Sequence, residues 1–143
     1  MAISKRTVRE LIGAAMAVRR NAYAPYSKFP VGAALLADDG SVLTGCNVEN
    51  SSYGLSCCAE RNAVAAAISG GKRGLVAIAI AADTTKPVAP CGACRQVLSE
   101  FNPVMTVIMV AQDGRTKTAR LDRLLPYAFG PRQLRTGNKK KKT

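Results

Sequence analysis

Two short apolar runs constrain the fold of this chain more than any other feature of its sequence. Residues 76–82 consist only of Val, Ile and Ala, and residues 104–111 are rich in Val, Ile and Met. Such runs are typical of strands covered on both faces of a sheet. A helix-forming stretch over about 91–101 lies between them and ends before Pro103. This order predicts two parallel strands joined by a crossover helix.

The rest of the chain adds further helices and strands to this unit. The predicted elements are a helix from the N-cap Ser4 to about residue 22, a hairpin of strands over 31–37 and 41–48, a helix over about 58–69, a weak strand after residue 114 and a short helix near 121–125. This alternation predicts an α/β fold whose sheet has a parallel core and carries helices on both faces.

The length and charge of the chain limit the number of domains and indicate a basic tail. The 143 residues suffice for one domain, which we expect over 1–134. The formal charge is +12, and four of the cations are Lys139 to Lys142, so we expect residues 135–143 to form a basic, disordered tail. The apolar runs are too short to cross a bilayer, and the start of the chain lacks the apolar core of a signal peptide. We therefore expect a cytoplasmic protein with no membrane partner.

Five cysteines and the absence of histidine limit the chemistry. In the cytosol thiols stay reduced, so closely spaced cysteines indicate metal binding or redox work. Without an imidazole base, the usual Ser and Cys hydrolase triads are excluded. A bound metal would have thiolate and carboxylate ligands.

Two segments combine cysteines with predicted helix starts: Cys58-Ala59-Glu60 and Pro90-Cys91-Gly92-Ala93-Cys94. The N-terminus of a helix stabilises a thiolate. Cys91 and Cys94 fall on one face of a first turn, and Cys58 supplies a third ligand. Three protein ligands leave the fourth position of a tetrahedral zinc open, as in catalytic sites. Glu60 lies close enough to carry protons.

Other interpretations of these cysteines stay open at this stage. A structural zinc site could recruit Cys46 or Cys57 as a fourth ligand, although Cys57 adjoins Cys58. A redox protein could use Cys91 and Cys94 as its reactive pair. The basic charge also allows a zinc-stabilised nucleic-acid-binding module.

Several sequence blocks extend the pattern beyond the cysteines. They are Tyr23-Ala-Pro-Tyr-Ser-Lys-Phe-Pro-Val-Gly-Ala-Ala34, Gly45-Cys-Asn-Val-Glu-Asn50, Cys58-Ala-Glu-Arg61, Pro90-Cys-Gly-Ala-Cys-Arg-Gln96, Leu124-Leu-Pro126 and Phe129-Gly-Pro131. With them the chain resembles the cytidine deaminase family, in its small branch with three cysteine ligands. The resemblance covers most of residues 20 to 131.

This resemblance implies a three-layer α/β/α sandwich with a five-stranded mixed sheet, usually a homotetramer, with one Zn²⁺ per chain. It implies hydrolysis of cytidine and deoxycytidine to uridine and deoxyuridine plus ammonia, as in pyrimidine salvage. Glu60 would be the catalytic residue, and Cys58, Cys91 and Cys94 the metal ligands. The implied substrate-binding residues are Phe29 against the pyrimidine, Asn47 and Glu49 at the ribose hydroxyls, Ala59, and Tyr53 and Phe129 in sites shared between subunits.

Arg61 has an expected role of its own. Three thiolates around one dication leave a negative centre, and a guanidinium that donates to them restores the pull of the metal on water. Arg61 would therefore affect the rate without contacting the substrate.

Related substrates remain alternatives within the same chemistry. They include a blasticidin-type antibiotic, a nucleotide and a polynucleotide base. The Asn47 and Glu49 pair favours a nucleoside, because a neutral amide beside a carboxylate suits a sugar diol better than a phosphate. Aromatic residues make up only 5% of the chain, so a nucleic-acid partner is not expected.

Overall fold

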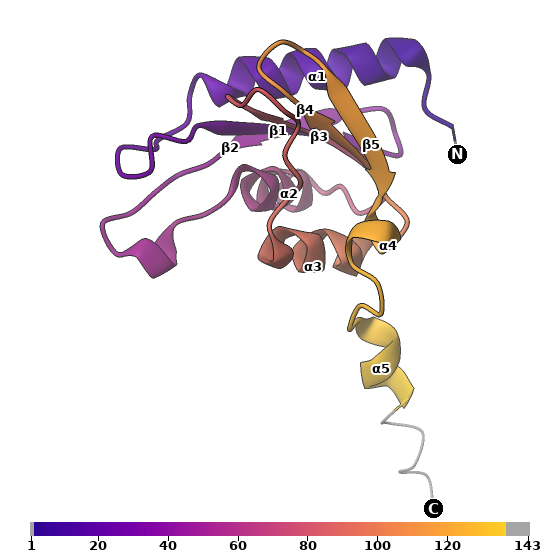
Figure 1. The fold of residues 1–143 in the computed structure, drawn as a ribbon. Helices are drawn as coiled ribbons and strands as arrows, with labels where there is room; N and C mark the ends of the chain where they lie inside the picture. The colour runs from indigo at the N-terminus through magenta and orange to yellow at the C-terminus, as the bar shows by residue number, and fades with distance from the viewer. Residues whose placement is uncertain (1, 137–143) are drawn as a thin grey trace, which may run out of the picture.

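A five-stranded mixed sheet runs through the middle of the protein in the computed structural model, which describes residues 2–136 (Figure 1). In spatial order its strands are β2 (Val42–Cys46), β1 (Val31–Ala37), β3 (Leu75–Ala82), β4 (Thr106–Val110) and β5 (Thr116–Arg120). The helices are α1 (Lys5–Arg19), the 3₁₀ turn η1 (Tyr53–Leu55), α2 (Ala59–Ser69), α3 (Gly92–Phe101), α4 (Leu121–Leu124) and α5 (Pro131–Thr136).

The strand pairing corrects one prediction. β3 and β4 are parallel, as expected from their crossover helix α3, but β1 pairs antiparallel with both β2 and β3. β1 thus separates β2 from β3, so the parallel core expected from the alternating pattern is reduced to one pair among the described strands. β5 completes the sheet antiparallel to β4. The five-stranded mixed sheet that the family resemblance implied is confirmed.

The helices cover the sheet from two sides, which gives three layers. α1 lies on one face, and α2 and α3 lie on the other (Figure 1). The α1 face buries Leu11 and Ala15 against the sheet, while the opposite face buries a larger cluster that includes Leu98 and Met105. Every residue of β3 except Val76 is buried, as expected for a strand covered on both faces.

Two glycines allow the helices to lie close to the sheet. A Cβ atom on Gly32 would lie 2.1 Å from the carbonyl oxygen of Ala15 in α1. A Cβ on Gly45 would lie 2.4 Å from the backbone nitrogen of Ala63 in α2. Neither distance is sterically allowed, so the absence of a side chain sets both contacts. Gly45 thereby sets the depth of the helix that carries Glu60.

The ends of the chain add detail that the sequence pattern did not contain. α1 begins after Ser4, whose side chain accepts a hydrogen bond from the Thr7 backbone as predicted, but the helix ends at Arg19, before residue 22. α5 was not predicted and extends past the expected domain boundary at residue 134. Residues 137–143 of the expected tail lie outside the described residues. No helix within residues 2–136 has the length and apolar character needed to span a membrane.

Candidate metal centre and catalytic site

Two helix starts bring three cysteines together. Cys58 is the N-cap of α2, Cys91 is the N-cap of α3, and Cys94 lies in the first turn of α3. Their Sγ atoms all lie within 4.8 Å of one another, and those of Cys58 and Cys91 are 3.8 Å apart. The predicted grouping of these residues is therefore present, beside the first backbone N–H groups of both helices, which have no carbonyl partner within the helix.

The electrostatics of the cluster favour a bound cation. Hydrogen bonds with Cys94, Arg61 and Cys91 lower the pKa of the Cys58 thiol to about 5. The hydrogen bond with Cys58 and burial raise the pKa of Cys94 instead. The Cys58 thiol thus loses its proton readily, whereas the Cys94 thiol keeps its proton, because adjacent thiolates repel one another. A dication removes that repulsion, and three sulfur donors at helix ends suit zinc.

Cys46 and Cys57 are not part of the cluster. Cys46 ends β2, and its carbonyl oxygen accepts a hydrogen bond from Asn62 of α2. Cys57 exchanges two backbone hydrogen bonds with Val48, both 2.9 Å long. Among the described residues, the grouped metal ligands are three cysteines and not four. This count favours a centre with an open position over a closed structural site.

Glu60 lies in the first turn of α2 and is almost fully buried, with 5% of its surface exposed. Burial raises the pKa of this carboxyl group, and the negative charge of Cys58 adds to the effect. A carboxyl group with a raised pKa takes up and releases protons more easily near neutral pH than an ordinary glutamate. Glu60 interacts with both Cys58 and Cys94, so it borders the cluster as predicted.

Arg61 follows Glu60 and contacts the cluster from outside. Its Nη2 atom donates to the carbonyl oxygen of Ser56 at 3.2 Å and to Sγ of Cys58 at 3.9 Å. Its Nε atom is buried and has no hydrogen-bond partner. The guanidinium is thus held next to Cys58, one of the three cysteines expected to bind the metal.

The expected sugar-binding residues form hydrogen bonds within the chain. The Asn47 side chain accepts from the Val31 backbone at 2.8 Å and donates to the Phe29 carbonyl at 2.9 Å. One oxygen of Glu49 accepts from the backbone N–H groups of Tyr26 and Ser27. These bonds reach the loop between α1 and β1, which carries Phe29, and the first residue of β1, Val31.

Aromatic side chains surround this loop. The Phe29 side chain is exposed, and the ring of Tyr53 packs edge-to-face on Tyr26 with centroids 5.7 Å apart. Ala59, in contrast, is fully buried at the start of α2. Sequence reasoning missed Tyr26, although it stands in the same block as Phe29.

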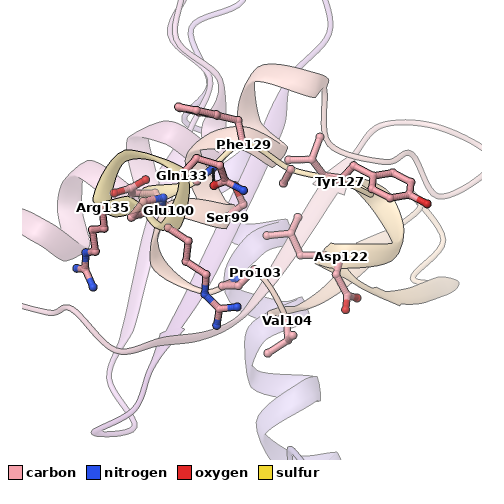
Figure 2. Close-up of a pocket in the computed structure, with 15 residues that line it drawn as sticks. Ser99, Glu100, Pro103, Val104, Asp122, Tyr127, Phe129, Gln133 and Arg135 are labelled. Atoms are coloured by element: carbon pink, nitrogen blue, oxygen red, sulfur yellow. Dashed lines mark hydrogen bonds between the residues drawn. The ribbon is translucent and has the colours of Figure 1, made fainter. Parts of the chain in front are cut away.

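Phe129 lies elsewhere. It lines a groove of about 620 Å³ beside the C-terminal half of α3, together with residues such as Ser99, Glu100 and Tyr127 (Figure 2). None of the three cysteines lines this groove. The Phe129 side chain is 58% exposed. Phe129 is therefore not grouped with the cluster of its own chain.

Two residues of α3 connect the cysteine cluster with the segment that carries Phe129, and the sequence analysis gave neither of them a role. Arg95 donates to the carbonyl oxygens of Pro90, at 2.8 Å, and of Leu124, at 2.6 Å. Gln96 donates to the carbonyl oxygen of Phe129 at 2.8 Å. Arg95 and Gln96 directly follow Cys94 in the sequence block that runs from Pro90 to Gln96. Their position in this block was the signal from which a role could have been predicted.

A three-layer α/β/α fold with three cysteines and a buried glutamate at two helix starts is the arrangement expected of a metal-dependent hydrolase. Residues 5–111 match the family described as the cytidine and deoxycytidylate deaminase zinc-binding region. The cytidine deaminase of Sporosarcina psychrophila is 50% identical over 128 residues, which cover 89% of this chain and 94% of that protein. The cytidine deaminase of Halalkalibacterium halodurans is 52% identical over 120 residues, covering 83% and 91%.

Solved structures agree with these relatives. The crystal structure of cytidine deaminase from Burkholderia pseudomallei has a TM-score of 0.83 and 48% identity, and the match covers 89% of this chain and all of that one. The enzyme from Mycobacterium tuberculosis has a TM-score of 0.74 and 46% identity, covering 86% and 97%. The chain belongs to the zinc-dependent cytidine deaminase family. Its cofactor is zinc, one ion per chain.

Proposed function

We propose that this protein hydrolyses cytidine and deoxycytidine to uridine and deoxyuridine with release of ammonia. The observation that carries the proposal is the buried Glu60 beside three clustered cysteines in a chain of this family. The cytidine deaminases named above, about 50% identical over most of the chain, support the substrate.

Cys58, Cys91 and Cys94 would hold the zinc. When bound, the ion would lower the pKa of water and stabilise negative charge on the oxygen that attacks the ring carbon. The cysteines contribute a site whose geometry is set by two helix N-caps. Arg61 offsets part of their negative charge through its hydrogen bond to Cys58.

Glu60 is the group that would move protons. Its carboxylate would accept a proton from the attacking water and deliver it to N3 of the pyrimidine. The carboxylate would then take a second proton from the new hydroxyl group on C4 and pass it to the departing amine, so that the C4–N bond breaks, ammonia leaves and a carbonyl group remains on the ring. The raised pKa suits a residue that must act first as base and then as acid. Burial limits its exchange with bulk water, so the transferred proton stays at the reacting centre.

The remaining site residues would bind the nucleoside. Phe29 would pack on the pyrimidine, Asn47 and Glu49 would contact the ribose hydroxyls, and Ala59 would line the base pocket beside Glu60. An amide and a carboxylate close together offer both a donor and an acceptor to a sugar diol.

A homotetramer with shared sites would explain the position of Phe129. Its ring lies away from the cysteines of its own chain and is exposed, and Tyr53 is exposed as well. Exposed aromatic side chains are enriched where protein surfaces meet. In the assembly, Phe129 and Tyr53 of one subunit would reach the site of another.

The free thiols of the chain favour a reducing compartment. All five cysteines are free thiols in the structure, and thiolate ligands need a reducing compartment. We therefore place the protein in the cytoplasm, where recycling of pyrimidine nucleosides would use it.

The decisive experiment follows the loss of the cytidine absorbance band with zinc-loaded protein, with ammonia measured in parallel. Equal amounts of uridine and ammonia support the proposal. Stoichiometric zinc without turnover of cytidine or deoxycytidine would disprove it. A panel with a cytosine nucleotide and a blasticidin-type antibiotic then tests the rival substrates.

A further inference from the structure

The loop between α1 and β1 is held by side chains that lie about twenty residues further along the chain. Oε1 of Glu49 accepts from the backbone N–H of Tyr26 at 3.0 Å and of Ser27 at 3.1 Å. Asn47 holds the far end of the loop through Phe29 and Val31. These four bonds connect the loop to the segment that follows β2.

The same segment also connects to the metal centre. Val48, between Asn47 and Glu49, pairs with Cys57 through two backbone hydrogen bonds, and Cys57 precedes the metal ligand Cys58. On its other side, the segment bonds to Tyr23 at the start of the loop. The segment 47–49 therefore lies between the loop and the cysteine cluster and sets the position of one relative to the other.

The loop needs such support because its backbone is strained. Lys28 has a φ of 56°, in the left-handed region that non-glycine residues rarely adopt. Such a conformation persists only where the surroundings hold it in place. The residues on either side of Lys28 are held by side chains: Glu49 binds Ser27, and Asn47 binds the carbonyl of Phe29.

We propose that Glu49 is a positioning residue, which fixes the Tyr26–Ser27 backbone and thereby orients Phe29 for the substrate base. Ser27 extends the connection, because its Oγ accepts a hydrogen bond from the Phe29 backbone at 3.1 Å. Hydrogen bonds from Ser27 and Tyr26 also lower the pKa of Glu49, which keeps it a charged acceptor. The role of Phe29 in this proposal rests on the proposed function. The positioning role of Glu49 comes in addition to any contact that Glu49 makes with the sugar.

Kinetics can separate loop positioning from sugar contact. The substrates are cytidine and 2′,3′-dideoxycytidine, which lacks both ribose ring hydroxyls. E49A removes the acceptor, whereas E49Q keeps an oxygen that can accept from Tyr26 and Ser27. If Glu49 positions the loop, E49A lowers kcat/KM at least about tenfold on both substrates, and E49Q stays within about threefold of wild type on dideoxycytidine. A loss with E49A that disappears on dideoxycytidine would overturn the proposal.

A second readout does not depend on turnover. Lys28 is exposed, so trypsin can cleave between Lys28 and Phe29 once the loop loosens. In zinc-loaded full-length protein, we expect this cut, followed by mass spectrometry, to be about tenfold faster in E49A than in wild type. E49Q should stay within about threefold. Cleavage after Arg9, inside α1, serves as the reference for unfolding of the whole protein.

D113A is the matched control, because Asp113 also binds a backbone N–H in an exposed turn, that of Arg115 between β4 and β5. It should leave both readouts at the wild-type level. Equal cleavage at Lys28 in wild type and E49A would overturn the positioning role even if cytidine is deaminated. A wild-type protein that does not turn over cytidine would instead contradict the proposed function, while the cleavage rates would still test the loop.

Discussion

The guanidinium of Arg61 lies 3.9 Å from the sulfur of Cys58 and is held there by a second bond to the carbonyl of Ser56. The same bonding lowers the pKa of Cys58 and raises that of Arg61, so each group favours the charged form of the other. With zinc bound to Cys58 as proposed, this positive charge would draw electron density from the sulfur. We therefore expect the metal to act more strongly on water than it would beside three uncompensated thiolates.

This relationship predicts the effect of removing the charge. R61Q should keep close to one zinc per chain at neutral pH and lower kcat about 10- to 100-fold, with KM little changed. R61K should recover part of the loss because it restores the charge without the planar geometry. Zinc analysis and steady-state kinetics on cytidine test both variants. An R61Q protein with wild-type kcat would show that the contact is only structural.

Glu60 leads to a different prediction, because its role is proton transfer. E60Q is nearly isosteric and neutral, so the buried side chain should fit and zinc should stay bound. Turnover should fall about 100- to 10,000-fold, since the amide cannot accept the proton. Turnover is measured from the loss of cytidine absorbance, zinc loading by metal analysis, and stability by a thermal melt. If E60Q kept its activity with full zinc loading, Glu60 would not be the residue that transfers protons.

The grouping of the three cysteines could be predicted from the sequence because its signals are local. Cys58 and Cys91 directly precede helices, and a helix start shows in a few consecutive residues. The spacing from Cys91 to Cys94 then follows from one helical turn. These residues lie together in the structure as expected.

Pairing across the sheet and long-range side-chain bonds could not be predicted in the same way. β1 pairs with both β2 and β3, and Gly32 and Gly45 let helices approach opposite faces of β1 and β2, but no local pattern contains that pairing or that packing. The partners of Glu49 lie 22 and 23 residues earlier in the chain. An acidic residue in a loop says nothing about such a partner until the fold brings them together.

The metal ligands can be tested against a neighbouring cysteine. C94S should lose most of its zinc and its activity, because Cys94 is fully buried in the cluster and a hydroxyl is a poor zinc ligand. C57S should keep both, since the contacts of Cys57 with Val48 involve only backbone atoms. Zinc is measured by metal analysis after gel filtration. Loss of zinc in C57S would assign the metal a different ligand set.

Gly45 predicts a link between packing and the metal centre. In G45A the new methyl would clash with Ala63 and Ala59 of α2, which should cost about 1–3 kcal/mol of stability and weaken zinc binding by displacing the helix start. G13A is the control, because Gly13 is an exposed helical position with nothing within 4 Å of the added carbon. It should gain about 0.5–1 kcal/mol. Denaturant unfolding of the zinc-loaded proteins measures both, and an unchanged G45A would contradict the close approach.

Sites shared between subunits would show in a mixing experiment. If Phe129 of one subunit completes the site that holds Glu60 of another, E60Q and F129A are each impaired at every site as pure proteins. Mixed tetramers are formed by dissociating and reassembling equal amounts of the two variants. With random assembly, about a quarter of the shared sites receive an intact Glu60 from one subunit and an intact Phe129 from another, so the mixture should regain about a quarter of wild-type activity. A mixture that only averages the two variants would show that each chain builds its site alone, and Phe129, on the groove beside α3, would then have no contact with the substrate.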